Sequence, residues 1–203
     1  NKPMKKIVIV GGGSAGWLTA GVIAAEHNAK SESGLQVTLI ESPEISTVGV
    51  GEGTWPTMRE TLDKIGINET DLLRECEASF KQGAKFSQWV TGAKDDFYYH
   101  PLVLPQGYTK TDLVFPWQKH RDEISFADAV SYQGHICEQG RAPKLISTPE
   151  YAGIANYAYH LNAVKLGQFL QKHCIEKLGV KHIIDHVTQV NSADNGDIAS
   201  VTT

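Results

Sequence analysis

The first forty residues alternate apolar runs with polar turns in the order strand, helix, strand. Residues 7–10 form a continuous apolar run that ends in three consecutive glycines, which predicts a parallel strand buried on both faces. Residues 14–27 follow with a helical pattern, and a polar segment at 28–34 leads to a second apolar run at 35–40. A right-handed crossover then places the two strands side by side and parallel. This order predicts an α/β fold of the Rossmann-like type.

The rest of the chain has shorter and less regular patterns. Residues 42–56, rich in Gly, Ser, Thr and Pro, predict a long loop, and residues 92–116, punctuated by aromatic residues and prolines, predict irregular structure. Helical patterns occupy four further segments, 57–65, 69–77, 126–137 and 162–178. Strand patterns occupy 86–90, 181–190 and 198–202, and the last two form a hairpin across Asp194-Asn195-Gly196.

Composition and charge narrow the classes of function. The 203 residues are 41% hydrophobic and 21% charged, as in an ordinary globular domain. With 19 basic and 23 acidic side chains the formal charge is −4, which gives no support to binding of nucleic acid or anionic membranes. The three cysteines are far apart and form no CxxC pair, so we predict neither a structural metal site nor disulfides. The lack of a disulfide framework predicts a reducing cytoplasm as the location, and no apolar run is long enough to span a membrane.

A glycine-rich turn lies between the first strand and the first helix. Residues 11–16, Gly-Gly-Gly-Ser-Ala-Gly, match the pattern GxGxxG. In this pattern Gly11 makes the tight turn, Gly13 lets a pyrophosphate approach the backbone, and Gly16 lets helix and strand pack closely. The pyrophosphate then lies at the positive end of a helix. The context of strand, turn and helix predicts dinucleotide binding.

Glu41 ends the second predicted strand and is the expected ligand of a ribose. Its separation from the glycines exceeds the usual ~20 residues, and the polar segment at 28–34 accounts for the excess. The alternative is that Glu41 is only a solvated carboxylate at a strand end. These features do not by themselves separate FAD from NAD.

Three further segments resemble the flavin-dependent halogenases of the tryptophan-halogenase type. Residues 13–17 have the form of their glycine motif, residues 48–56 resemble their flavin-contacting loop, and residues 74–81 resemble the stretch that bears their catalytic lysine. Residues 157–190 are also similar to the family. The resemblance covers nearly the whole chain in the correct order, so the chain is identified as the amino-terminal part of such an enzyme.

The resemblance implies a fold and a division of the chain. The fold is a Rossmann-like FAD-binding fold of the hydroxybenzoate-hydroxylase, or glutathione-reductase-like, class. It is truncated, because neither the family's WxWxIP motif nor the glutamate that pairs with the lysine is present. Within one halogenase domain, residues 1–56 form the FAD-binding βαβ unit and flavin loop. Residues 57–150 form an excursion with the catalytic lysine and a substrate-side segment, and residues 151–203 return to the FAD-binding module.

The implied reaction is halogenation of an electron-rich, indole-like aromatic substrate with FADH2, O2 and chloride or bromide. A separate flavin reductase supplies reduced FAD, oxygen converts it to a hydroperoxide, and halide attack on the hydroperoxide gives hypohalous acid. Lys81 matches the lysine that presents the halogen, as a chloramine or as a hydrogen-bond donor. The resemblance leaves a homodimer open. Two alternatives remain: an FAD-dependent monooxygenase or oxidoreductase of the same fold without halide chemistry, and an inactive FAD-binding fragment.

The glycine motif and the resemblance together name the expected site residues. The expected cofactor contacts are Gly11, Gly13, Ser14, Ala15, Gly16, Trp17, Glu41, Val50, Gly51, Glu52 and Val187. Thr54 and neighbouring backbone amides are expected to hold halide, and His100 is expected on the substrate side. Structural roles stay open for three of these residues: Glu52 as a cap of the next helix, His100, and Val187 as a buried strand residue.

One departure from the family concerns the substrate. Tryptophan halogenases hold the indole between aromatic rings, and one ring lies two residues beyond the histidine that His100 matches. Here that position is Leu102. Offset stacking contributes about 0.5–1.5 kcal/mol beyond burial. We therefore expect a preference for an aromatic compound other than free tryptophan.

Overall fold

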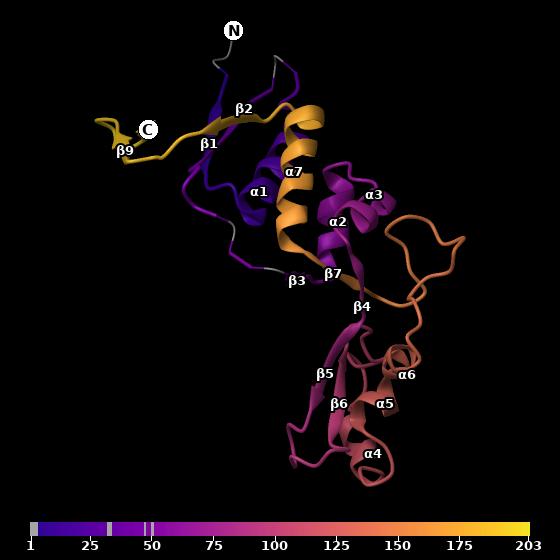
Figure 1. Ribbon diagram of the computed structural model, residues 1–203. Coiled ribbons are helices and arrows are strands. Elements are labelled where there is room, and N and C mark those ends of the chain that lie inside the picture. The colour runs from indigo at the N-terminus through magenta and orange to yellow at the C-terminus, as the bar shows by residue number, and fades with distance from the viewer. Residues whose placement is uncertain (1–3, 32–33, 47, 50) are drawn as a thin grey trace. The chain divides into compact units, whose positions relative to one another are not determined.

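The computed structural model describes residues 4–31, 34–46, 48–49 and 51–203, and its elements are shown in Figure 1. The chain divides into two compact units. Unit 1 contains residues 1–52, 60–78 and 161–203, and unit 2 contains residues 53–59 and 79–160.

Unit 1 is built on a three-stranded parallel sheet with the order β1-β2-β8. Its strands are β1 (Lys6–Val10), β2 (Gln36–Glu41) and β8 (Lys181–Ile184). Helix α1 (Ser14–Glu26) connects β1 to β2 and packs on β2, and helix α7 (Ala163–Leu178) lies beside α1 (Figure 1). The predicted βαβ unit is therefore confirmed.

The core of unit 1 lies between this sheet and its helices. Its fully buried side chains include Trp17, Val37, Leu39 and Leu170. β1 differs from the prediction of burial on both faces, which was wrong: Val8 and Val10 are 45% and 56% exposed. Val8 and Val10 alternate with the half-buried Ile7 and Ile9, so they lie on the face of β1 opposite to the one that α1 covers.

Two short helices, α2 (Thr57–Lys64) and α3 (Glu69–Glu75), precede the lysine segment. Most of their length belongs to unit 1, and the excursion of residues 57–150 stays a prediction. Apolar packing at the end of α2 accounts for their place in unit 1. An added Cβ on Gly21 of α1 would lie 3.2 Å from Cys174 Sγ of α7 and 3.4 Å from Ile65 Cγ2, so these elements are in close contact.

Helix and strand boundaries in unit 1 follow recognisable signals. Asn68 caps α3 by accepting a hydrogen bond from the Asp71 amide, and Asn162 caps α7 in the same way. Gly179 ends α7 with φ of 72°, a left-handed conformation that favours glycine. The predicted strand 181–190 is two strands, β8 and β9 (Gln189–Ser192), and β9 pairs with β10 (Ile198–Thr202) in the expected antiparallel hairpin.

Unit 2 contains short strands and helices. Strand β4 (Ser79–Lys81) pairs with β7 (Ala158–Asn162), and β5 (Gly83–Ser87) pairs with β6 (Phe97–Pro101), both antiparallel. A three-stranded sheet has the order β3-β7-β4, in which β3 is Gly51–Gly53. The helices are α4 (Val114–Gln118), α5 (Phe126–Val130) and α6 (Gln133–Glu138).

Several sequence expectations for unit 2 need correction. The loop predicted at 42–56 contains β3, and the irregular segment 92–116 contains β6 and the first residues of α4. The strand expected at 86–90 lies at 83–87, because it pairs with β6 and its Phe86 ring stacks on Tyr98 with centroids 5.1 Å apart. The helix expected at 126–137 is divided into α5 and α6, because Ser131 adopts an extended conformation with ψ of 137°.

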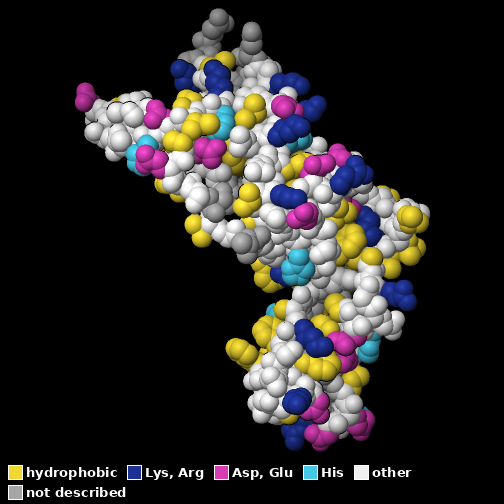
Figure 2. All heavy atoms as spheres, in the orientation of Figure 1, with side chains coloured by type: hydrophobic (Ala, Val, Ile, Leu, Met, Phe, Trp, Pro, Cys, Tyr) yellow, Lys and Arg dark blue, Asp and Glu magenta, His cyan; other side chains and the backbone are white. Residues whose placement is uncertain are grey.

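Charged side chains of both signs lie on the surface of the described residues. Figure 2 shows acidic and basic side chains interspersed over the face in view. Within the residues that the structure describes, no helix has the length and apolar character needed to cross a membrane. All three cysteines are free thiols, and Cys76 and Cys174 are buried.

Candidate functional site

The glycine turn of unit 1 has the geometry expected from its motif. Gly11 has φ of 121°, and its amide donates to the Ile40 carbonyl oxygen at 2.8 Å, which joins the turn to β2. An added Cβ on Gly16 would collide with the Gly11 carbonyl oxygen, whereas one on Gly13 would meet no atom within 4 Å. Gly11 therefore turns the chain, Gly16 permits close packing, and the space beside Gly13 is open, as predicted.

The amino terminus of α1 is suited to an anion. Gly13 is its N-cap, and no side chain caps the helix there. The first turn also carries no acidic residue. Backbone amides at such a helix start are free to donate to phosphate oxygens, and the helix dipole favours negative charge at this end.

Gly12, which the motif treats as a variable position, is constrained by Glu41. An added Cβ on Gly12 would overlap the Glu41 carboxylate. The carboxylate therefore lies directly against the glycine turn. The alternative interpretation, a carboxylate free in solvent, does not describe this position. Sequence reasoning missed the role of Gly12.

His182 of β8 holds the Glu41 carboxylate from its other side. The His182 Nε2 to Glu41 Oε1 distance is 2.6 Å, and the side chains are 12% and 26% exposed. The imidazole ring meets the Trp17 ring edge-on, with centroids 5.1 Å apart. Trp17 is fully buried. His182 was not among the predicted residues.

The glycine turn and Glu41 border a cavity of about 400 Å³ in unit 1. Its lining residues are Gly11, Gly12, Gly13, Ser14, Ala15, Glu41, Ser42, Ile45, Ser46, Val48, Glu52 and Ala163. Six of the predicted cofactor contacts are thus brought together around one space. The lining combines backbone amides, one carboxylate at the strand end and apolar side chains, a set that fits the pyrophosphate and ribose of a dinucleotide.

The other predicted cofactor contacts lie apart from this lining. Gly16 and Trp17 are packed beneath the turn, and Gly51 is exposed in β3. Val187 is half-buried between β8 and β9. Val50 lies outside the described residues. Cofactor contacts by these residues, and by the six that line the cavity, stay predictions.

Lys81, the last residue of β4, is the centre of the candidate site in unit 2. Its Nζ donates to the Thr54 carbonyl oxygen at 3.0 Å and lies 4.8 Å from the centroid of the Trp55 ring. The side chain is half-buried, and its strand is paired with β7. One acceptor and one aromatic face therefore orient the ammonium group, which has further N–H groups to donate.

Thr54 is rigidly held beside the lysine. Its amide donates to the Tyr159 carbonyl oxygen at 2.8 Å, and its Oγ1 accepts from the Tyr159 amide at 3.0 Å. Thr54 is 8% exposed. These bonds fix the carbonyl that receives Lys81, and they occupy the amide and hydroxyl that the halide prediction would use. Halide binding by Thr54 stays a prediction.

Trp55 was not predicted as a site residue. It is 63% exposed, although its ring faces Lys81. The signal in the sequence was the position of Trp55 inside the loop at 48–56 that resembles the flavin-contacting loop.

The predicted substrate-side segment, defined as residues 100–103, begins in the last residues of β6 and continues past its end. His100 is exposed and lies opposite Ala84 of β5, and Leu102 comes directly after the strand. Leu102 also lines a cavity of about 340 Å³ in unit 2, together with Arg59, Val103, Leu104, Tyr132, Gly153, Ile154, Ala155 and Asn156. The structure therefore places Leu102 at a concave surface, while a role for His100 stays a prediction.

A buried amide, Gln133, organises this segment. Gln133 is fully buried, and its Oε1 accepts from the amides of Leu102 at 2.7 Å and Val103 at 2.8 Å. Its Nε2 donates to the Asn156 carbonyl oxygen at 2.7 Å and lies 3.4 Å from Gln82 Oε1. Because Gln82 follows Lys81 in the chain, one side chain connects the lysine strand to the substrate-side segment.

Arg59 also contacts this region. Its guanidinium donates to the Tyr151 carbonyl oxygen at 3.1 Å and to Asn156 Oδ1, and it lies 4.2 Å from the centroid of the Tyr157 ring. Asn156 in turn donates from Nδ2 to the Leu102 carbonyl oxygen at 3.1 Å. Leu102 is thus held at both its amide and its carbonyl.

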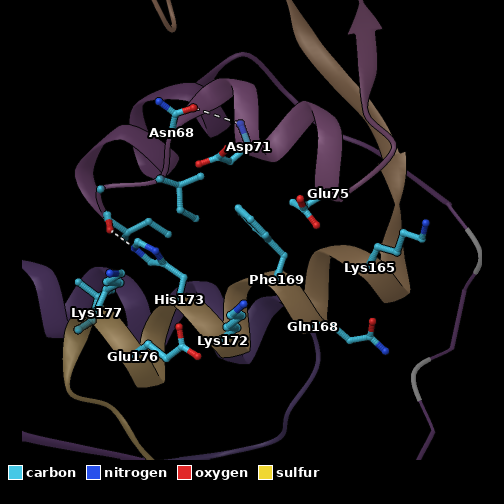
Figure 3. Close-up of a pocket in the computed structure, with 14 residues that line it drawn as sticks. Asn68, Asp71, Glu75, Lys165, Gln168, Phe169, Lys172, His173, Glu176 and Lys177 are labelled. Atoms are coloured by element: carbon cyan, nitrogen blue, oxygen red, sulfur yellow. Dashed lines mark hydrogen bonds between the residues drawn. The ribbon is translucent and has the colours of Figure 1, made fainter.

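A larger cavity, about 930 Å³, lies elsewhere in unit 1 and contains none of the predicted residues (Figure 3). Phe169 projects into it from α7, and His173 Nε2 donates to the Ile65 carbonyl oxygen at 2.6 Å. Its remaining charged side chains are of both signs, Asp71, Glu75, Glu176, Lys165, Lys172 and Lys177. Size alone does not make it the candidate site, because its groups converge on no common chemistry.

Comparisons with known proteins place the chain in a family. The sequence pattern of the protein family described as tryptophan halogenase matches residues 6–203. The chain is 33% identical over 214 residues to tryptophan 7-halogenase RebH of Lentzea aerocolonigenes, covering 98% of this chain and 39% of that protein.

Two solved structures are also similar. The crystal structure of a tryptophan halogenase from Shewanella frigidimarina NCIMB 400 has 50% identity and a TM-score of 0.90, covering 98% of this chain and 40% of that one. Xcc4156, a flavin-dependent halogenase from Xanthomonas campestris, has 31% identity and a TM-score of 0.80, covering 98% and 38%. The chain thus spans well under half the length of the relatives that it matches.

Proposed function

Because the chain belongs to the tryptophan halogenase family, we propose that it is the FAD-binding and lysine-bearing part of an enzyme that halogenates an electron-rich aromatic substrate. Its fold is the Rossmann-like α/β fold of the flavin-dependent halogenases. The single observation that carries the proposal is the placement of Lys81 between the Thr54 carbonyl and the Trp55 ring, inside the segment that resembles the family's lysine stretch.

The cavity of unit 1 is proposed to bind FAD. The amides at the start of α1 would hold the pyrophosphate, and Glu41 would accept hydrogen bonds from the adenosine ribose. When bound, reduced FAD would supply two of the four electrons that reduce O2, and the halide would supply the other two, which gives hypohalous acid and water. We propose that a separate flavin reductase delivers this reduced FAD and that the halide is chloride or bromide. The three free thiols fit a reducing cytoplasm as the location.

Lys81 is proposed to act as a hydrogen-bond donor to hypohalous acid. The Thr54 carbonyl occupies one N–H of the ammonium group, so the others remain to donate to the oxygen of HOX. Donation withdraws electrons from that oxygen and makes the halogen more electrophilic. The aromatic carbon then forms a bond to halogen, the O–X bond breaks, and the ring proton leaves with the oxygen as water.

The aromatic substrate is proposed to be something other than free tryptophan. Leu102 supplies no ring on the substrate side, whereas Trp55 places a ring directly beside Lys81. Indole, a phenol or a larger aromatic compound fits this arrangement. A competition assay among tryptophan, indole and a panel of phenols checks the proposal through kcat/KM, and preferred turnover of tryptophan would contradict it.

The test of function uses the full-length protein with a flavin reductase, bromide and an aromatic panel. Lys81→Ala should lower brominated product at least about 100-fold while flavin oxidation continues, since a positioned proton donor contributes about 10²–10⁴-fold. Lys85→Ala is the matched control, because Lys85 pairs with Glu138 at 2.6 Å. Lys85→Ala should form brominated product within about threefold of the wild-type amount.

Three results would count against the proposal. Substantial halogenation by Lys81→Ala would remove Lys81 from the reaction. Equal losses in both lysine variants would indicate a general effect on folding. Oxygenated product that forms regardless of halide would identify a flavin monooxygenase without halide chemistry.

A further inference from the structure

The Glu41 carboxylate is held between two groups that the glycine motif does not include. One of its oxygens lies against the α-carbon of Gly12, and the other lies 2.6 Å from His182 Nε2. We infer that His182 is the positioning residue that holds Glu41 ready for the adenosine ribose of FAD. This inference rests on the proposed FAD-binding function of the same cavity.

The direction of the hydrogen bond follows from the chemistry of its partners. An ionised carboxylate only accepts hydrogen bonds, so Nε2 of His182 carries the hydrogen and donates it to Glu41 Oε1. A carboxylate has about four acceptor sites on its two oxygens. One is occupied by His182, and the remaining sites are available to ribose hydroxyl groups.

The surroundings make this bond a firm constraint. The side chains of His182 and Glu41 are 12% and 26% exposed, and water competes weakly for a charge-assisted bond at that depth. The buried Trp17 ring meets the imidazole edge-on and limits its rotation. The Asp185 amide donates to the Glu41 carbonyl oxygen at 3.0 Å, which holds the backbone at the end of β2.

Positioning matters because a glutamate side chain is otherwise free at a strand end. A Glu side chain loses considerable rotamer freedom when it is ordered. If the protein orders Glu41 before the ligand arrives, binding does not bear that entropic cost. His182 is thus assigned a role in the affinity for FAD although it does not line the cavity.

The test measures binding of two ligands to the full-length protein by flavin fluorescence. The ligands are FAD and a synthetic FAD whose adenosine ribose lacks the 2′ and 3′ hydroxyl groups. The wild type should bind the dideoxy compound about tenfold more weakly, as expected for loss of hydrogen bonds to a charged group. His182→Leu should bind FAD about tenfold more weakly than the wild type, but it should distinguish the two ligands by less than about threefold.

Two further variants complete the design. His182→Gln keeps an N–H donor and should restore most of the discrimination. His120→Leu is the matched control, because it removes a histidine from an exposed pair with Glu123 at 3.2 Å. It should leave both affinities unchanged.

The outcomes separate the inference from the proposed function. An equal weakening of both ligands by His182→Leu would mean that His182 serves folding alone, and unchanged FAD affinity would mean that it has no role; either overturns the inference. A wild type that binds FAD but ignores the ribose hydroxyls overturns it while FAD binding stands. A wild type that binds no FAD overturns the proposed function together with the inference.

Discussion

Replacing Gln133 by Leu removes a side-chain amide whose oxygen accepts hydrogen bonds and whose nitrogen donates them. Leu is similar in size, so the change tests the polar contacts more than the packing. It leaves the amides of Leu102 and Val103 and the carbonyl oxygen of Asn156 without the partners that they have at 2.7, 2.8 and 2.7 Å. Each buried polar group left without a partner costs about 1–3 kcal/mol.

The expected loss is smaller than the sum of three full penalties. Leu102, Val103 and Asn156 are half-buried, so water reaches part of this region when the chain relaxes. The new leucine also gains apolar burial. We therefore expect the free energy of unfolding to fall by about 3 kcal/mol, the lower end of the summed range. The substrate-side segment should also lose its fixed position relative to the lysine strand.

The measurement is denaturant unfolding of the full-length protein, with Gln139→Leu as the matched control. Gln139 lies only six residues further on and is exposed. Exposed substitutions of this kind change stability by no more than about 0.5 kcal/mol. Equal stability of the two variants would refute the reasoning.

Gln133→Glu adds a test with a sign that depends on pH. The carboxylate still accepts from Leu102 and Val103, but it can no longer donate to the Asn156 carbonyl oxygen. Burial should raise the pKa of the introduced Glu above its unfolded value. Protonation of the introduced Glu restores a donor. The loss of unfolding free energy relative to the wild type should therefore be small below the unfolded pKa, and it should grow as pH rises through the folded pKa. A deficit independent of pH would contradict this account.

Two further predictions concern the glycine turn and the buried thiols. Gly12→Ala should displace the Glu41 carboxylate and weaken FAD binding about tenfold, measured by titration, and unchanged affinity would show that Glu41 does not bind the cofactor. Burial raises the pKa of the Cys76 and Cys174 thiols to about 12, so both should resist alkylation at pH 8 in the folded protein and react in urea. Because the folded pKa is the higher one, this stabilisation is complete below the unfolded pKa and is lost as pH rises toward 12, which unfolding curves at pH 8 and 10 would detect.

Elements defined by local periodicity could be predicted from the sequence. α1 and α7 were expected almost to their observed ends. α7 repeats its apolar pattern over 16 residues, and α1 is a run of small and apolar residues that directly follows the glycine turn. β6 was missed, because its partner β5 lies in a separate segment and aromatic residues follow no simple alternation there. Burial of β1 was overestimated, because an apolar run does not show which of its faces receives a covering element.

The candidate sites divide in the same way. Lys81 and the glycines could be named because each belongs to a short continuous motif. Gln133 could not, because its four hydrogen-bonding contacts reach segments from 23 to 51 residues away. His182 left one usable signal: it lies in a predicted strand, but only the sheet order β1-β2-β8 places that strand beside Glu41.

Gly12 shows why a motif can be matched correctly and still be interpreted incompletely. GxGxxG assigns meaning to Gly11, Gly13 and Gly16 and leaves the second position free. In this structure an added Cβ on Gly12 would overlap Glu41, whereas one on Gly13 would meet open space. Steric restriction by the protein itself is therefore stronger at the variable position than at the second motif glycine. The two restrictions have different origins. Gly13 must leave room for the proposed cofactor, and Gly12 must leave room for Glu41, the side chain that is proposed to bind that cofactor.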